Sequence, residues 1–359
     1  MRTRATVSAA LALVVPLVAA MLAACSGHEG PAATSASDAG APPIDPLCAG
    51  APIDEPPDDL RCTGLYEDWE TKRVAKSARA YAPALSFWSD CAEKTRFLAL
   101  PEGTTIDASD PDEWVFPAGT KAWKEMKIGG RRVETRLFWK TRGGVGSDAR
   151  WVQTAYVWSA DETSARRSDG AVVDLGSAKY VVPKDEDCAS CHAGKKDRLH
   201  GFDAVSLGLP GATGTTLAAL ADDHRIAPAP ARTLLALGDD GTGHAAPALA
   251  WLHVNCGTSC HNDSPTARAF GTGLRLRLRV GELDGGRHAW DAIATAVDAS
   301  ARTPKWSGEA RIVPGDPDRS LLVSLVSARG AEQMPPIATR VVDPDGIHRL
   351  RSWIAAMPP

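Results

Sequence analysis

The chain of 359 residues is long enough for two domains of ordinary size. Its composition, 44% hydrophobic and 23% charged, is typical of globular proteins and excludes collagen, coiled coil and wholesale disorder. A formal net charge of −4 gives no electrostatic support for a nucleic-acid partner, and we expect none.

The first residues resemble a bacterial lipoprotein signal peptide. Arg2 and Arg4 precede an apolar run that ends in Leu-Ala-Ala directly before Cys25. We therefore expect residues 1–24 to be removed and the Cys25 thiol to carry lipid. A plain secretory signal with an incidental cysteine and a retained membrane anchor are the alternatives. Ser26 is compatible with the outer membrane, so we expect an exported lipoprotein that faces the periplasm and is held by acyl chains.

Residues 25–60 are rich in Pro, Ala, Asp, Ser and Gly. Such a segment buries too little apolar surface to offset the entropy lost on ordering, so we predict a disordered tether. Three cysteines lie in or after it, in a compartment that favours disulfides. Cys48–Cys62 and Cys62–Cys91 are both plausible pairs.

Residues 61–187 carry the signals of β-strands. An alternation of apolar and polar residues places Glu134, Arg136 and Lys140 on one face of a strand. Gly-Gly and Pro-Xaa-Gly sequences separate the apolar runs. We predict a β-rich, sandwich-like domain here, with a helix or two near its start, around 67–80.

Helical signals follow within residues 188–359. Asp343-Pro344 is a cap with a first-turn proline, followed by an apolar helix face; Asp316-Pro317 has the same form, and Pro247 suits the first turn of another helix. The exception is the strict alternation over 274–280, which predicts a strand with three arginines on one face: Arg275, Arg277 and Arg279. That face is either a solvated edge or a docking face for an acidic partner.

The sequence Cys188-Ala-Ser-Cys191-His192 is a CxxCH motif (188–192), the attachment signal of c-type haem. In this chemistry both thiols bond to the haem vinyl groups, and the adjacent imidazole is the proximal ligand of the iron. A Cys188–Cys191 disulfide with a bystander histidine, or a zinc site, is the alternative.

The sequence Cys256-Gly-Thr-Ser-Cys260-His261 is a CxxxCH motif (256–261), with one more residue between the thiols. We expect a second covalent haem c here, with His261 as an axial ligand of its iron. The alternative is a disulfide loop descended from a haem site. Met334, in Gln-Met-Pro-Pro before the last helix, suits the distal position on the iron of His261.

No methionine lies between His192 and Cys256, so the first iron requires another distal ligand, water or none. Among the histidines of that segment, His200 is the candidate distal ligand. It is the nearest in sequence and follows a basic loop.

Several short motifs occur in the same order as in a known family. They lie at 63–68, 87–90, 155–158, 188–192, 312–317 and 334–336. Together they resemble a sparsely characterised family of bacterial diheme c-type cytochromes, over about residues 60–359. The resemblance implies haem and electron transfer, but the family has CxxCH where this chain has CxxxCH. The expected fold is α+β: a β-rich, sandwich-like N-terminal domain (61–187) followed by a mainly α-helical, cytochrome c-like haem domain (188–359).

The pattern favours an electron carrier over an enzyme, and it singles out no catalytic residue. We expect a lipid-anchored cytochrome that exchanges electrons with redox partner proteins through two covalent haems. A diheme peroxidase-like oxidoreductase is an alternative, because an iron without a methionine ligand could bind peroxide. A binding or structural lipoprotein with degenerate haem sites is the third possibility.

Overall fold

The computed structural model describes residues 45–176, 179–285 and 290–359. The predicted signal peptide (1–24), the lipidation site Cys25 and the first part of the tether lie outside these residues. Within the described ranges, no helix combines the length and the apolar character needed to cross a membrane.

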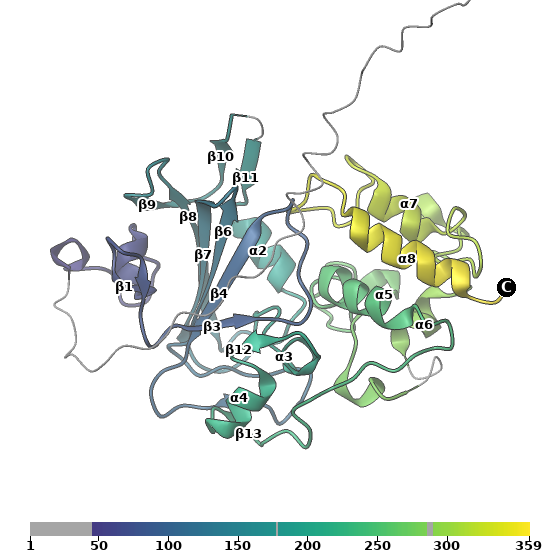
Figure 1. Cartoon of the computed structure of the whole chain (residues 1–359), viewed down its shortest axis with the longest axis horizontal. Helices are drawn as coiled ribbons and strands as arrows, with labels where there is room; N and C mark the ends of the chain where they lie inside the picture. Colours follow the sequence, from purple (N-terminus) through teal and green to yellow (C-terminus); the bar gives the residue numbers. More distant parts are fainter. Residues whose placement is uncertain (1–44, 177–178, 286–289) are drawn as a thin grey trace, which may run out of the picture. The chain divides into compact units, whose positions relative to one another are not determined.

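The largest element is one antiparallel sheet of seven strands (Figure 1). Its strand order is β12 (Thr213–Gly214), β3 (Arg79–Ala82), β4 (Glu93–Ala99), β6 (Lys121–Ile128), β7 (Arg131–Arg142), β8 (Arg150–Trp158) and β9 (Ala165–Ser168). Gly129 and Gly130 join β6 to β7 with φ of 57° and 77°. Two positive φ values in a two-residue loop match the right-handed twist of a hairpin, and glycine adopts them without a steric penalty.

Three two-stranded ladders accompany this sheet. They are β1 (Tyr66–Asp68) with β2 (Arg73–Val74), β10 (Ala171–Asp174) with β11 (Lys179–Val182), and the parallel pair β5 (Ile106–Asp107) with β13 (Ile226–Ala227). The predicted sandwich is therefore wrong, because a single large sheet replaces two stacked sheets. The helix predicted around 67–80 is also wrong, since the chain there forms β1, β2 and the start of β3.

The region after residue 188 is not the mainly α-helical domain that the sequence predicts. Its helices are α3 (Ala204–Gly208), α4 (Leu217–Asp222), α5 (Ala245–Leu252), α6 (Asp291–Ala296), α7 (Leu321–Ser327) and α8 (Pro344–Ala356). Of these helices in the described ranges, only α8 exceeds eight residues, and helices this short depend on tertiary packing for their stability. Long irregular segments separate them, and β12 and β13 pair with strands from the first half.

Local signals are confirmed at some of the predicted helices. The Asp343 carboxylate accepts the Gly346 N–H at 3.0 Å and caps α8, whose Leu350 and Ile354 are fully buried. Helix α5 carries Pro247 in its first turn. Asp316-Pro317, in contrast, forms a turn, and α7 begins later, at Leu321.

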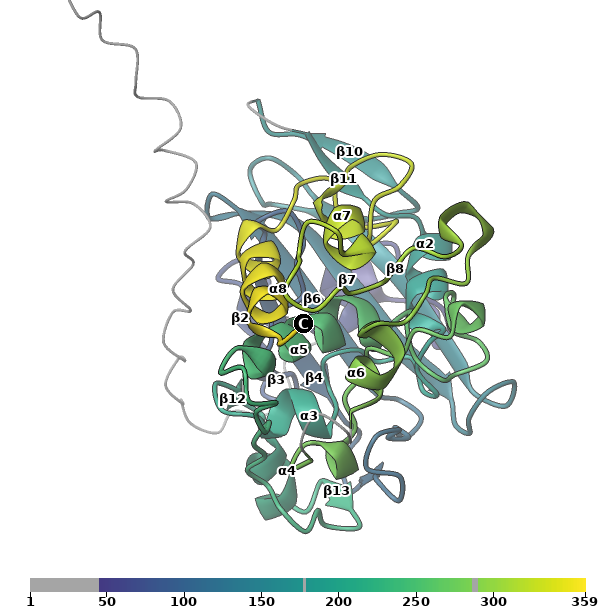
Figure 2. The ribbon, with the colours of Figure 1, turned by 90° about the vertical axis from the view of Figure 1, so that its right-hand side faces the viewer.

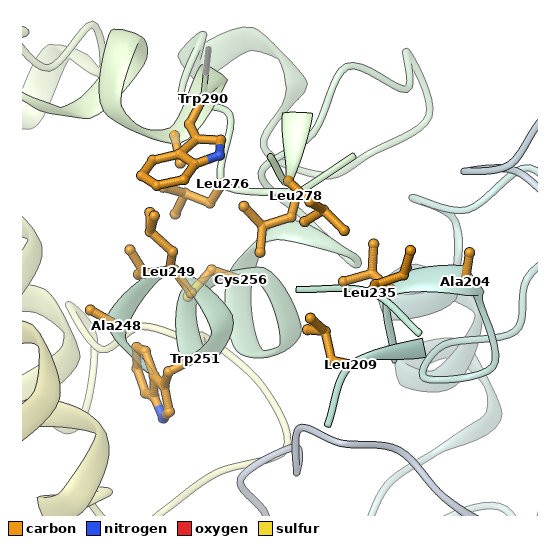
Figure 3. Close-up of a cluster of buried hydrophobic side chains, with 14 of the residues drawn as sticks. Ala204, Leu209, Leu235, Ala248, Leu249, Trp251, Cys256, Leu276, Leu278 and Trp290 are labelled. Carbon is orange, nitrogen blue, oxygen red and sulfur yellow. The ribbon is translucent and has the colours of Figure 1, made fainter. Parts of the chain in front are cut away.

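One hydrophobic cluster joins the sheet to the segment that follows it. It contains Leu98 and Phe138 from the sheet together with Leu249, Trp290 and Trp353. Figure 3 shows its centre, where Leu249 and Trp290 lie with Cys256, Leu276 and Leu278. Helix α8 packs against both α5 and α7, and the view of Figure 2 shows these three helices together. The predicted boundary at residue 188 is therefore crossed by a continuous apolar core.

Both faces of the sheet are covered. One face carries Phe97, Trp123 and Leu137 as cross-strand neighbours in a second hydrophobic cluster. The opposite face carries Glu134 and Lys140, each with 0% exposure. The alternation predicted for β7 is thus present, and its polar face is buried under the chain that follows.

The N-terminal end of the described chain is attached to the sheet. A disulfide joins Cys48 to Cys62, with a Cα–Cα distance of 5.2 Å, which selects one of the two pairings expected from the sequence. The Tyr156 hydroxyl donates to the Pro57 carbonyl oxygen at 2.8 Å, and Leu60 is fully buried.

Candidate functional site

The CxxCH motif occupies the short helix α2 (Asp185–His192), labelled in Figure 1. This helix packs against β8. Three acidic residues fill its first turn, where negative charge complements the partial positive charge of a helix N-terminus. Cys188 and Cys191 are three residues apart and therefore share a helix face. Both are free thiols.

His192 is held from three directions. Its ring stacks on Phe138 with centroids 4.1 Å apart, and the His200 ring lies beside it at a tilt, with centroids 4.4 Å apart. Its Nδ1 is 2.5 Å from the Arg198 carbonyl oxygen. Because a carbonyl only accepts, Nδ1 carries the proton and Nε2 keeps its lone pair for a metal. Burial lowers the pKa of His192 to about 3, so the imidazole is neutral at pH 7.

Arg198 adopts an unusual backbone conformation to present that carbonyl. Its φ is +68°, in the left-handed region that non-glycine residues seldom occupy. Such conformations cost on the order of 1 kcal/mol or more and persist where the surroundings hold them. Here the neighbouring residue Asp197 is fixed by buried contacts, and these hold the loop that contains Arg198.

Asp197 anchors the loop that follows α2. Its Oδ2 is 2.6 Å from Lys140 Nζ and also accepts the Phe116 N–H at 2.6 Å. Its Oδ1 accepts the Trp151 indole N–H at 2.7 Å. The Lys140 and Asp197 side chains are 0% and 1% exposed, so the ion pair is fully buried and each charge depends on the other.

His200, the candidate distal ligand, lies beside His192. Its Nε2 donates to the Cys191 carbonyl oxygen at 3.2 Å, and its Nδ1 is buried with no hydrogen-bond partner among the described residues. With metal–nitrogen bonds of about 2 Å, two imidazoles on one iron have centroids roughly 6 Å apart. The centroids of His192 and His200 are 4.4 Å apart in this structure, which is shorter than the separation of two imidazoles that bind one iron.

The sheet beneath the motif is rich in cations. Arg96, Lys124 and Arg136 are cross-strand neighbours on β4, β6 and β7. Burial, followed by the charges of Arg136 and Arg96, holds the pKa of Lys124 well below its ordinary value. Arg136 Nε is paired with Glu134 Oε1 at 2.5 Å. The sequence alternation predicts that Arg136 shares the face of Lys140, but no sequence signal predicts that α2 covers this face.

Both thiols of the first motif are protonated at neutral pH. Burial raises the pKa of Cys188 to about 11 and that of Cys191 to about 11. Thiolates, not thiols, are nucleophiles and ligands of metal ions. Among the described residues, no group of three or more His, Cys, Asp and Glu side chains is arranged to hold a metal ion.

The second motif lies on a widened helical turn. Helix α5 continues into a π-helical segment, His253–Gly257, where the Thr258 N–H bonds the His253 carbonyl at 2.8 Å. The His261 N–H bonds the Cys256 carbonyl, five residues back, also at 2.8 Å. A π-turn holds one more residue than an α-turn. It therefore accommodates the additional residue of CxxxCH, and both Cys256 and Cys260 are free thiols.

His261 is nearly buried and uncharged. Burial, followed by the positive charges of Arg311 and Arg275, lowers the pKa of His261 to about 4. Its Nδ1 has no hydrogen-bond partner within the described part of the chain. Its carbonyl oxygen accepts the Leu276 N–H at 2.8 Å. An orphaned, neutral, buried imidazole nitrogen is suited to a ligand that the protein itself does not supply.

The segment 274–280 supports the second motif in place of forming the predicted strand. It is extended, but its N–H groups bond to groups other than a neighbouring strand. Leu278 N–H donates to His253 Nδ1 at 2.9 Å, and Arg275 N–H donates to Thr295 Oγ1 at 2.9 Å. Of the three arginines, Arg277 is buried and pairs with Glu113. The prediction of a solvated face that carries all three arginines is therefore wrong.

Met334 lies on the loop before α8. Its N–H donates to the Leu325 carbonyl at 2.9 Å, and its side chain packs against the large hydrophobic cluster. Its neighbours Gln333 and Pro336 line a cavity of about 320 Å³ together with Asp187, which precedes Cys188. Hydrogen bonds and ring contacts of the described residues do not connect Met334 to His261.

The two motifs lie against each other. Thr266 Oγ1 donates to the Ala193 carbonyl at 2.6 Å. A Cβ on Gly194 would lie 2.0 Å from the Ser259 carbonyl oxygen, so only glycine permits this approach. Cys191 is close enough to Ser259 and Cys260 for both to influence its pKa. The sequence contains no signal that predicts this contact.

The donor sets fit covalent haem on the chemistry of their atoms. Each motif offers two reduced thiols and a neutral histidine, and His192 also has a hydrogen bond that leaves Nε2 available. Comparisons with protein-family models, curated proteins and solved structures found no match.

Proposed function

We propose that the protein is an exported, lipid-anchored c-type cytochrome that carries two covalent haems and transfers electrons between partner proteins. The observation that supports it best is the geometry of His192. Its protonated Nδ1 is 2.5 Å from the Arg198 carbonyl, and its Nε2 is available at the end of a helix with two free thiols. Second-sphere bonds of this kind orient histidine ligands of metals.

The chain's own residues would bind each haem and adjust its reduction potential. Haem, when bound, supplies a one-electron iron couple. Cys188 and Cys191 would form thioethers with the first haem, and His192, fixed between Phe138 and His200, would bind its iron.

Cys256, Cys260 and His261 would bind the second haem in the same way, and we retain Met334 as the proposed distal ligand of its iron. Thioether ligation favours reduced iron and raises the potential. The contact between Gly194 and Ser259 supports a short path between the two groups. Lipid on Cys25 would hold the protein at the outer membrane, facing the periplasm.

The test is a haem stain on a denaturing gel, combined with the mass of the intact protein. The protein is made in a bacterium that matures c-type cytochromes. We expect two haems in the wild type and one in each of C188S/C191S and C256S/C260S. The matched control, C48S/C62S, removes a disulfide and keeps both haems. A wild type without covalent haem contradicts the proposal and favours a binding lipoprotein with degenerate sites.

A peroxide assay distinguishes the carrier from a diheme peroxidase. Reduced wild-type protein is mixed with hydrogen peroxide and an electron donor. We expect no sustained turnover of peroxide. Rapid turnover that is lost in C188S/C191S indicates an enzyme that works at the first motif.

A further inference from the structure

A cavity of about 350 Å³ lies next to the segment that bonds to the second motif: Thr295, which lines it, accepts the Arg275 N–H, and the following Leu276 N–H donates to the His261 carbonyl. Gly273, Thr295, Arg302 and Arg311 are among the residues that line it. Its volume is at the lower end of the range for ligand pockets, about 300–1,000 Å³. It can therefore accept a small acid or one edge of a larger molecule.

Two arginines, Arg302 and Arg311, line this cavity, and Arg275 is close enough to Arg311 to lower its pKa. We call Arg275, Arg302 and Arg311 the arginine cluster. Arg311 is 6% exposed and donates to two backbone carbonyls, Thr295 O at 2.7 Å and Thr272 O at 2.5 Å. A Cβ at Gly273 would be 2.6 Å from Arg302 Nη1, so Arg302 lies directly against that backbone.

No carboxylate of the described chain forms an ion pair with any of the three arginines, although their neighbour Arg277 pairs with Glu113. Burial and the charges of Arg302 and Arg275 lower the pKa of Arg311, which reflects the mutual repulsion. Arg302 is exposed to solvent, but Arg311 is buried, and a buried charge beside like charges is costly unless an opposite charge joins it. An anion in the cavity would offset this repulsion.

The arginine cluster is close to His261. The Leu276 N–H, one residue after Arg275, donates to the His261 carbonyl, and both Arg311 and Arg275 depress the pKa of that imidazole. Guanidinium groups form paired hydrogen bonds with carboxylates and are the preferred partners for them in partly buried sites.

We propose that the arginine cluster binds carboxylate groups, and that these are the propionates of a haem attached at Cys256 and Cys260. This assignment rests on the proposed function. A free dicarboxylate has the same chemistry, and the experiment separates the two sources.

The variants are R302Q and R275Q, at positions where the side chain is exposed or half-buried, so that the fold is retained. The matched control is R349Q, an exposed arginine on α8 far from the cluster in sequence. The first measurement is a redox titration of the haem-loaded protein. The second is calorimetry with succinate, in the wild type and in C256S/C260S.

If the propionates occupy the cluster, R302Q and R275Q shift one of two redox waves to lower potential, and R349Q shifts neither. Succinate then binds C256S/C260S but not the loaded wild type, and R302Q in the C256S/C260S background weakens that binding about tenfold, as expected for loss of a charged hydrogen-bond donor.

Succinate binding to the loaded wild type, with unchanged potentials in R302Q, overturns the propionate assignment and identifies a free dicarboxylate as the ligand. Unchanged potentials together with no succinate binding to either protein overturn the carboxylate site itself. If the wild type carries no haem at the second motif, the proposed function fails there. Succinate binding that R302Q abolishes then supports the carboxylate site alone.

Discussion

The two cysteine–histidine motifs offer the same chemical groups on different supports. The first lies on a regular helix against the seven-stranded sheet, with His192 between two aromatic rings and bonded to a loop that a buried ion pair anchors. The second lies on a π-turn among irregular segments, and its His261 has an unpartnered Nδ1 among the described residues. The first site is therefore built by long-range packing, whereas the second is built by local backbone hydrogen bonds and nearby arginines.

This difference predicts unequal sensitivity to substitution. Changes in the sheet should disturb the first motif and leave the second intact, and changes near residues 253–278 should do the reverse. Substitutions at the contact between the motifs should affect both.

The largest effect is expected for K140M, which leaves the Asp197 carboxylate buried without its cation. Breaking a buried pair in this way costs about 3–5 kcal/mol. The free energy of unfolding, measured by denaturant titration, should fall by that amount, and the yield of haem attached at the first motif should fall more than the yield at the second. The control R351Q removes an exposed pair with Asp318, and it should cost about 0.5 kcal/mol or less. Equal losses of stability in K140M and R351Q would contradict the conclusion that the buried Lys140–Asp197 pair supports the first motif.

The next largest effect is expected from acid, which at the second motif acts through His253. Burial lowers the pKa of His253, whose Nδ1 accepts the Leu278 N–H, to about 4, against the opposing charge of Asp203. Between pH 4 and 6.5 the unfolded chain binds a proton that the folded chain does not, so this contribution is present above about pH 6.5 and is lost as the pH falls towards 4. At about 1.4 kcal/mol per pKa unit, the full effect is on the order of 3 kcal/mol.

The measurement is the free energy of unfolding as a function of pH. H253N retains an oxygen that can accept the Leu278 N–H, but it does not titrate. We expect a flatter profile between pH 4 and 6.5 in this variant. An unchanged slope would show that other groups govern the acid response.

A smaller effect is expected for G194A at the contact between the motifs. The added methyl would lie 2.0 Å from the Ser259 carbonyl oxygen, so the two segments must separate. Overpacking of this kind costs about 1–3 kcal/mol. The control G281A adds a methyl to an exposed glycine with no atom within 4 Å, and its stability should be unchanged. Electron exchange between the haems, followed by stopped-flow absorbance, should slow in G194A only.

The smallest change in stability is expected for M334L, which conserves volume and costs less than about 1.5 kcal/mol. It removes the thioether, so the weak long-wavelength band of methionine-ligated ferric haem should disappear and one potential should fall. In C188S/C191S the band should remain, because we assign Met334 to the iron of His261. A band that is lost in C188S/C191S and kept in C256S/C260S would move Met334 to the first iron.

Local features of the molecule follow from the sequence alone. Helix α8 is predicted by its Asp343 cap and the spacing of Leu350 and Ile354, because the hydrogen bonds and the periodicity involve neighbouring residues. The alternation along β7 is predicted for the same reason. Both Cys-His motifs are recognised from the spacing of their cysteines and the histidine that follows.

Contacts between residues far apart in the chain were decided by the tertiary structure. The contact of Gly194 with Ser259, the pairing of Lys140 with Asp197, and the gathering of Arg275, Arg302 and Arg311 join residues far apart in the chain. No periodicity encodes such contacts. They depend on which surface each short element buries, and helices of five to eight residues have too little intrinsic stability to fix that choice by themselves. The polar face of β7 is buried for this reason: the segment that covers it is positioned by the common hydrophobic core.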